Sequence, residues 1–148
     1  MWKKIPLTPL FLGLAGVLPF AFLSATKIFG FDTAFGLPTQ PTSALYSLVI
    51  LSFMSGCIWS FSTGKGDYLG CALSTAPTLV GFFLVASTTV NSSFGFVGAV
   101  KAFVLLFPLL LILDYRAHQL GQTPDWWMQL RTILTALVVI CLLIIAVL

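Results

Sequence analysis

Long apolar stretches separated by short polar segments dominate the hydrophobic pattern of the chain. Five stretches contain almost no charged residue, and they cover residues 7–25, 41–62, 68–88, 94–113 and 129–148. Each is close to the roughly 20 residues that a helix needs to cross a hydrocarbon core of about 30 Å. The apolar residues do not alternate with polar ones, as they would in a membrane β-barrel. The pattern therefore predicts an all-α fold, an integral membrane bundle of five transmembrane helices.

The composition agrees with a chain embedded in a membrane. Of its 148 residues, 59% are hydrophobic and 7% are charged, and the mean hydropathy is +1.07. Soluble domains carry about 25% charged residues, because water must solvate their surface. The connectors, such as "TGKGD" and "TVNSS", are short and rich in turn residues. We therefore expect a single transmembrane domain over residues 1–148, with no soluble domain and with the lipid bilayer around it.

Lysine and arginine residues predict the orientation of the helices, because cytoplasmic loops carry an excess of them. With the N-terminus inside, the opposite side receives Lys27 and Lys101, and the cytoplasmic side receives Lys3, Lys4, Lys65, Arg116 and Arg131. This excess favours an N-in, C-out topology. No Arg- and Ser-rich presequence comes before the first stretch, so we expect a bacterial inner (plasma) membrane rather than an organellar one.

A cleaved signal peptide is an alternative interpretation of the first stretch. Lys3 and Lys4 would form its basic region, and "FLSATK" offers a weak cleavage site. Leu23 is large for the third position before that site, so a membrane helix is the favoured interpretation.

Small residues recur at helical spacing on both sides of the second connector. Ser52, Gly56 and Ser60 come every fourth residue in the second stretch, and the spacing returns in "GDYLGCALSTAP", which leads from the connector into the third stretch, with Gly66, Gly70 and Ser74. Small residues let membrane helices approach closely, so that dispersion contacts accumulate. We therefore predict that helices two and three form a tight antiparallel hairpin through these residues. The alternative is chance spacing in a chain rich in Ser and Gly.

The segment "LDYRAHQLGQTPDWWMQLR" contains the only histidine and several of the few charged residues. Its Thr123-Pro124 pair is expected to begin the fifth helix, as N-cap and first residue. Trp126 and Trp127 are expected to be aromatic anchors at the level of the lipid headgroups. For Arg131, a salt bridge to Asp114 or a cation–π contact with Trp127 is predicted. We interpret the segment as a membrane interface.

A catalytic interpretation of the same segment would use His118 as a general base, with Asp114 four residues earlier to orient it. No nucleophile motif, metal-ligand cluster or phosphate-binding loop accompanies them. Cys57, Cys71 and Cys141 lie in apolar stretches without paired spacing, which indicates buried thiols. We therefore predict no catalytic residue, no metal and no cofactor. The scattered basic residues also disfavour a nucleic-acid partner.

Lys101 lies about 8 Å inside the fourth stretch if that stretch begins near Gly95. An ionisable residue at such a depth is a candidate functional site. The alternative is that its long side chain snorkels to the surface, or pairs with Asp32 in the connector on the same side. The candidate binding residues are therefore Lys101, Asp114, Arg131 and His118.

Several segments together resemble a known family. They are "IPLTPLFLGLAGVLPFAF", "ILSFMSGCIWS", "APTLVGFFL" and "LDYRAHQLGQTPDWWMQLRTILTALVV". In this order they resemble domain of unknown function family 3429 (DUF3429), which is related to a mitochondrial transmembrane protein numbered 69. The more specific marks are Pro19-Phe20, Ser52-Phe53, Gly56, Trp59, Asp114, Pro124, Trp126, Leu130 and Arg131.

The chain departs from the family pattern at two positions. Ser55 replaces a common glycine and Trp127 a common tyrosine, and both changes keep the character of the site. The resemblance implies a small polytopic inner-membrane protein and brings no established activity or cofactor. It also favours a retained first helix, because the family pattern includes that stretch.

Three functions fit these observations to different degrees. The leading hypothesis is a non-enzymatic accessory or assembly component that packs against other membrane proteins or against itself, because the loops are short and small-residue faces suit helix contacts. The second is a small-solute or proton transporter or channel that uses Lys101 and the proline-kinked helices, with Pro19, Pro77 and Pro108 inside spans. The third is a membrane enzyme that uses His118 and Asp114.

Overall fold

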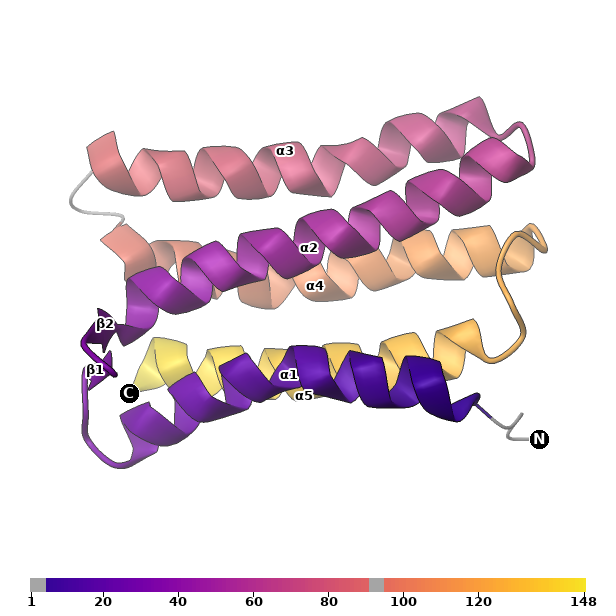
Figure 1. Ribbon diagram of the computed structural model, residues 1–148. Helices are drawn as coiled ribbons and strands as arrows, with labels where there is room; N and C mark the ends of the chain where they lie inside the picture. The colour runs from indigo at the N-terminus through magenta and orange to yellow at the C-terminus, as the bar shows by residue number, and fades with distance from the viewer. Residues whose placement is uncertain (1–4, 91–94) are drawn as a thin grey trace.

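The computed structural model describes residues 5–90 and 95–148 of the chain. The elements are α1 (Leu7–Ile28), β1 (Thr33–Ala34), β2 (Leu37–Pro38), α2 (Thr39–Gly64), α3 (Tyr68–Val90), α4 (Gly95–Gln119) and α5 (Trp127–Val147). Within the described residues, five helices are long and apolar enough to cross a membrane (Figure 1). The predicted all-α, multi-pass architecture is confirmed.

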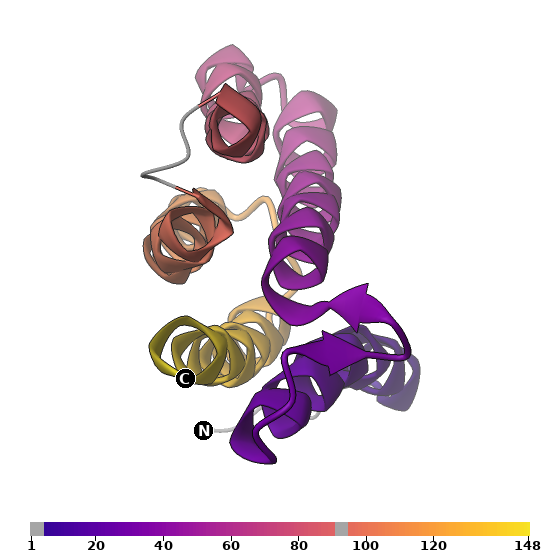
Figure 2. The same ribbon diagram turned by 90° about the vertical axis from the view of Figure 1, so that its left-hand side faces the viewer.

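The helices run antiparallel to their neighbours in sequence and form two rows. Seen along the helices, α3, α4 and α5 form one row, and α2 and α1 lie beside them (Figure 2). The most extensive contacts join α2 to α3, and α5 packs against both α4 and α1. α1 has little contact with α2. The first helix is therefore held in the bundle mainly by the last one.

Large apolar side chains fill the space between the rows. The largest that are fully buried are Phe20, Phe103, Phe107, Leu51, Leu110, Leu142 and Ile145. Gly81 of α3 lies directly over this core, because a Cβ there would come within 3.1–3.3 Å of Leu48, Leu51 and Phe103. The absence of a side chain at Gly81 lets α3 approach α2 and α4 closely.

Most helix ends lie within three residues of the sequence-based expectation, and the boundaries on either side of the α4–α5 connector show the differences that matter for the site. α4 continues past Leu113 to Gln119, because the polar side chains of this extension find partners on neighbouring segments. α5 begins at Trp127, with Trp126 at the N-cap position. The expected cap at Thr123 was wrong, because the Thr123 hydroxyl contacts His118 Nδ1 at 2.9 Å instead.

A short β-hairpin, which the sequence pattern did not indicate, joins α1 to α2. β1 and β2 pair antiparallel, with Ala34 opposite Leu37. Phe35 and Gly36 form the two-residue turn with φ values of 51° and 78°, the left-handed conformations that such turns require. The Phe35 ring stacks on Phe22 of α1 at a centroid distance of 5.3 Å, which places the hairpin against the end of α1.

The small-residue prediction for α2 identified the wrong face. α2 and α3 do lie side by side (Figure 1), and Gly70 and Ser74 of α3 are buried. On α2, however, Gly56 and Ser60 are exposed and Ser52 is half-buried. The buried face lies one residue away and contains Ser43, Ser47, Leu51, Ser55, Ile58 and Ser62.

The spacing of these residues explains why the wrong face was identified. From Ser43 to Ser55 the buried α2 positions keep the same interval of four residues as the predicted stripe. The stripe is offset from them by one residue, which is about 100° around the helix, so the interval alone did not indicate which face is buried. Gly66 lies outside both helices, in the turn between them, with φ of 70°.

Candidate functional site

A buried ion pair joins the end of α4 to the start of α5. Arg131 Nε donates to Asp114 Oδ2 at 2.7 Å, and Trp127 Nε1 donates to Asp114 Oδ1 at 2.8 Å. The side chains of Asp114 and Arg131 are 0% and 4% exposed. The predicted salt bridge between these residues is therefore present, with Trp127 as a hydrogen-bond donor rather than a cation–π partner.

The two adjacent tryptophans lie at the same end of the bundle and are half-buried. Their ring centroids are 6.1 Å apart, and the Trp127 ring also meets Phe61 of α2 edge-on at 5.0 Å. Trp127 is thus held by an aromatic contact and by its hydrogen bond to Asp114. Their predicted role as headgroup anchors remains a prediction.

His118 and Asp114 have different partners although they share a helix face. Both carboxylate oxygens of Asp114 accept hydrogen bonds from α5, whereas His118 Nδ1 contacts Thr123. To act as an oriented catalytic base, His118 would need a hydrogen bond to Asp114, but its Nδ1 contacts Thr123 instead. The geometry therefore gives no support to a His118–Asp114 dyad.

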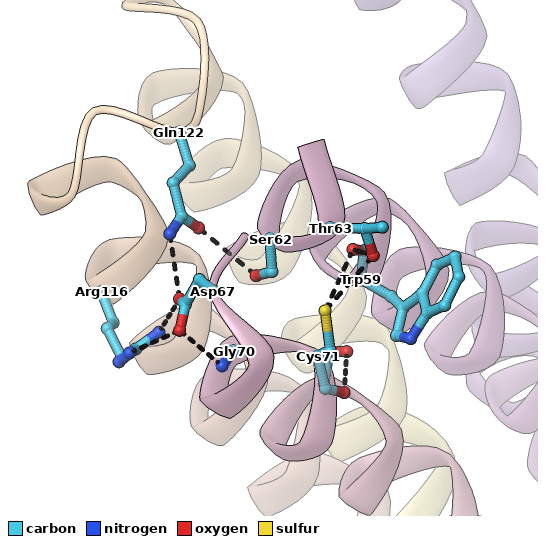
Figure 3. Close-up of polar contacts among 9 residues, drawn as sticks. Trp59, Ser62, Thr63, Asp67, Gly70, Cys71, Arg116 and Gln122 are labelled. Atoms are coloured by element: carbon cyan, nitrogen blue, oxygen red, sulfur yellow. Dashed lines mark hydrogen bonds and ion pairs between the residues drawn. The ribbon is translucent and has the colours of Figure 1, made fainter. Parts of the chain in front are cut away.

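A second cluster, which sequence reasoning missed, surrounds Asp67 in the turn between α2 and α3 (Figure 3). Arg116 Nη1 and Nη2 donate to its two oxygens at 2.6 and 3.3 Å, and Gln122 Nε2 donates at 2.9 Å. The backbone N–H of Gly70 also donates to Asp67 Oδ1, at 2.9 Å. One carboxylate thus joins the start of α3 to the end of α4 and the connector that follows it, about 50 residues later in the chain.

Electrostatics at Asp67 follow from these donors. The Arg116 guanidinium, followed by Gln122 and the Gly70 N–H, holds the pKa of the Asp67 carboxyl well below its usual range. An aspartate directly before a helix is a preferred capping residue, and this local signal could have identified half of the cluster. Its pairing with Arg116 depends on how the turns meet in space.

The opposite end of the bundle carries two lysines in different surroundings. Lys27, which is buried, donates from Nζ to Asp32 Oδ1 at 2.5 Å. Asp32, the acidic partner considered for Lys101, therefore pairs with Lys27. Lys101 is exposed on α4, in line with exposed Leu105, Leu109 and Ile112.

A cavity of about 540 Å³ lies between α1, α2 and α5. Most of its lining is apolar, and its polar residues include Arg131 and Thr135, which are 3% and 5% exposed. Arg131 Nη2 and Thr135 Oγ1 are buried and have no hydrogen-bond partner among the described residues. Lys101 and His118 are not lining residues. Only Arg131 among the candidate binding residues contributes to this cavity.

The cysteines lie in three different helices, α2, α3 and α5, and all three are thiols. Cys57 lines the cavity, and Cys71 Sγ lies 3.2 Å from Thr63 Oγ1 in the turn of the α2–α3 pair (Figure 3). Across residues 5–90 and 95–148, no group of three or more His, Cys, Asp or Glu side chains is placed to hold a metal ion.

Comparisons with known proteins agree with the membrane architecture. The family described as protein of unknown function (DUF3429) matches residues 5–147. The chain is also 29% identical over 146 residues to Transmembrane protein 69 of Xenopus tropicalis, with 95% of this chain and 54% of that protein covered. The chain thus spans about half the length of this curated relative. No solved structure matches the chain.

Proposed function

Since the chain belongs to the DUF3429 family, a family of unknown function, we propose that it is a non-enzymatic membrane protein that packs against the helices of other membrane proteins. In this role it is an accessory or assembly component of a larger complex. The observation that carries the proposal is the exposed small-residue face of α2.

This face contains Ser52, Gly56 and Ser60. A Cβ built at Gly56 meets no atom within 4 Å, and both Gly56 and Ser60 are exposed. Phe53 and Trp59, beside them on α2, are 63% and 48% exposed. In lipid, small residues flanked by large apolar ones allow another helix to approach closely and make dispersion contacts. The bundle itself uses the other face of α2.

The polar clusters support the non-enzymatic part of the proposal. The carboxylates of Asp67 and Asp114 each accept hydrogen bonds from an arginine and from further donors. A reaction that used either carboxylate would have to break contacts that hold the helices together. Their geometry suits a structural role.

The test is to fill the exposed face of α2. Gly56→Phe adds a bulky side chain where the structure has open space, so the fold is retained, but a partner helix is pushed away. We expect wild-type protein, solubilised in a mild detergent, to run on a native gel as part of a complex whose bands contain another protein by mass spectrometry. Gly56→Phe should run as the free chain.

Gly16→Phe is the matched control, because Gly16 of α1 also has no atom within 4 Å of an added Cβ but faces the internal cavity. This variant should run with the complex like the wild type. A wild-type chain that always ran alone, or a complex that tolerated Gly56→Phe, would contradict the proposed role.

The proposal includes an N-in, C-out orientation in a bacterial inner membrane. The ion pair of Asp67 with Arg116 supports placing the α2–α3 turn and the end of α4 on one side, and Lys65 and Arg116 contribute positive charge there. In a chain with Cys57, Cys71 and Cys141 replaced by Ala, Phe31→Cys should react with an impermeant maleimide on intact cells. Lys65→Cys should react only after lysis, and the reverse pattern would contradict the orientation.

A further inference from the structure

The cavity between α1, α2 and α5 has a mouth that faces the surroundings of the bundle. α1 packs along α5 and contacts α2 much less, mainly through Tyr46, whose hydroxyl donates to the Gly16 carbonyl at 2.9 Å, so a space remains between α1 and α2. Leu12 on α1 and Phe53 on α2 line the cavity and are 69% and 63% exposed. For helices that cross a membrane, this mouth opens towards lipid.

The cavity is long in the direction of the helices. Its lining on α5 extends from Trp127 to Val138, and on α1 from Thr8 to Val17. At 1.5 Å per residue, the α5 portion is about 17 Å long. The lining over this length is almost entirely apolar. A narrow, apolar space of this shape suits an extended hydrocarbon chain.

Two buried polar groups give the cavity a specific chemistry. Arg131 and Thr135 are one helical turn apart on α5, and both side chains line the cavity. Arg131 Nη2 and Thr135 Oγ1 have no hydrogen-bond partner among the described residues. A buried donor without a partner is unfavourable, so an occupant that supplies an acceptor at this level would bind preferentially.

Charge determines what kind of acceptor fits. Asp114 already balances the charge of Arg131, at 2.7 Å. A carboxylate or phosphate in the cavity would leave this buried site with an excess negative charge, which is unfavourable in a low-dielectric interior. A neutral carbonyl oxygen accepts hydrogen bonds without that cost.

The depth of Arg131 in the bundle further restricts the class of ligand that fits the cavity. Arg131 is four residues after the start of α5 at Trp127, which corresponds to about 6 Å along the helix. Interfacial tryptophans lie at headgroup level, and the ester carbonyls of a glycerolipid lie just below its headgroup. A lipid that entered from the side would therefore bring an ester carbonyl to the level of Arg131.

We propose that this cavity binds an acyl chain of a glycerolipid, whose ester carbonyl oxygen accepts hydrogen bonds from Arg131 Nη2 and Thr135 Oγ1. The chain lies along α5 towards Val138. The bound lipid fills the space that remains between α1 and α2. This binding does not depend on the partner-packing role of α2.

Native mass spectrometry of the delipidated protein tests the site. The probes are dioleoylphosphatidylethanolamine, its ether-linked analogue without carbonyl oxygens, and ubiquinone. We expect the wild type to retain one ester lipid, and to bind it at least about tenfold more tightly than the ether analogue, because one of the two donors is a guanidinium and hydrogen bonds from charged groups are stronger than neutral ones. Equal retention of the ester and the ether, or displacement of the ester by ubiquinone at equal concentration, would overturn the proposal.

Two matched variants test whether the lipid binds in this cavity or elsewhere on the protein. Gly16→Phe fills the cavity and should abolish retention, whereas Gly56→Phe, on the exposed face of α2, should retain lipid like the wild type. Retention of lipid by Gly16→Phe would show that the lipid binds elsewhere. The same pair of variants has the opposite expected outcomes for complex formation, so the two proposals fail independently.

The hydroxyl at position 135 provides the finest test. Thr135→Val removes the donor at nearly constant volume and should weaken ester binding about fivefold, and Thr135→Ser should restore it. Thr132→Val is the control, because Thr132 is exposed and donates to the Met128 carbonyl at 2.8 Å. Unchanged ester binding in Thr135→Val, or formation of a lipid-free dimer through this groove, would contradict the assignment.

Discussion

Two arginine–aspartate pairs hold the same end of the bundle, but they lie in different environments. Asp114 and Arg131 are 0% and 4% exposed in their side chains, whereas Asp67 and Arg116 are 15% and 34% exposed. In the first pair, Arg131 contacts the carboxylate through Nε, and Trp127 is a second donor. The second has two arginine contacts, an amide side chain and a backbone N–H.

The difference in burial changes what each pair does. When one member of a buried pair is removed, the remaining charge has no water to solvate it. Separating the helices that carry the two charges is therefore unfavourable. A pair at the edge of the bundle is solvated and screened by salt, and contributes less. The buried pair should therefore determine whether α4 and α5 stay packed, and the edge cluster should adjust how firmly the connectors are held.

The largest effect is expected at Asp114. Asp114→Asn leaves the Arg131 charge uncompensated in the interior and should lower the free energy of unfolding by about 3–5 kcal/mol. Thermal unfolding in a fixed detergent, followed by circular dichroism, measures the change in Tm. The double variant Asp114→Leu/Arg131→Met removes both charges and should recover most of the loss, and a double variant no more stable than Asp114→Asn would contradict the interpretation.

A smaller effect is expected at Asp67. Asp67→Asn removes the negative charge that pairs with Arg116 but leaves both groups near solvent, so the fall in Tm should be smaller than that of Asp114→Asn. The effect should also shrink with ionic strength, because the Debye length falls from about 10 Å at 0.1 M to 3 Å at 1 M salt. The Asp114→Asn effect should change little over the same range. Equal salt dependence of the two variants would remove the proposed distinction.

Lowering the pH should also weaken the contribution of the Asp67 cluster to stability. The folded-state pKa of Asp67 lies below its unfolded value, chiefly because of the hydrogen bonds from Arg116. Its contribution to stability is therefore complete above the unfolded pKa of about 3.9, and is lost as the pH falls from there through the lower folded pKa.

The difference in Tm between wild type and Asp67→Asn isolates this contribution, because the other carboxylates titrate in both proteins. The difference should be constant between about pH 5 and pH 7 and should shrink below about pH 4. Gln122→Glu offers a check on the cluster, because it places a second carboxylate beside Asp67 and should lower the Tm at neutral pH. A Tm difference that grew on acidification would contradict the assigned direction.

The spans and the buried ion pair could be predicted because their signals are local. A transmembrane helix must be long and apolar, and this requirement appears directly in the sequence. Asp114 and Arg131 border the fourth and fifth apolar stretches on either side of one short connector, so their meeting followed from antiparallel packing. The expected helix start at Thr123 failed because a tertiary contact with His118 engages the same hydroxyl.

The features that were missed depend on distant segments. Asp67 lies in the turn between α2 and α3, and Arg116 lies 49 residues later, near the end of α4. Their relative position is set only by the packing of α2, α3 and α4. The cavity at Arg131 and Thr135 arises because α1 packs on α5 rather than on α2. Nothing in the hydrophobic pattern of α1 indicates which of these two helices it contacts.

Lys101 should give the smallest effect and completes the comparison of charged residues. Its side chain is exposed, in line with the exposed apolar residues Leu105, Leu109 and Ile112 of α4. A long lysine side chain in this position can reach the headgroups while its methylene groups stay in lipid. Lys101→Met should therefore change the free energy of unfolding by no more than about 0.5 kcal/mol.

The same substitution separates a snorkelling lysine from a transport site. If Lys101 carried a solute or a proton, Lys101→Met would abolish flux in proteoliposomes, or would fail to rescue the growth phenotype of a deletion strain, while leaving the Tm unchanged. We expect neither change, because Lys101 lies on an exposed face of α4 and does not line the cavity. Lys101→Arg, which keeps the charge, is the matched control. A loss of flux in Lys101→Met that Lys101→Arg did not share would assign this lysine a function that its position on α4 does not suggest.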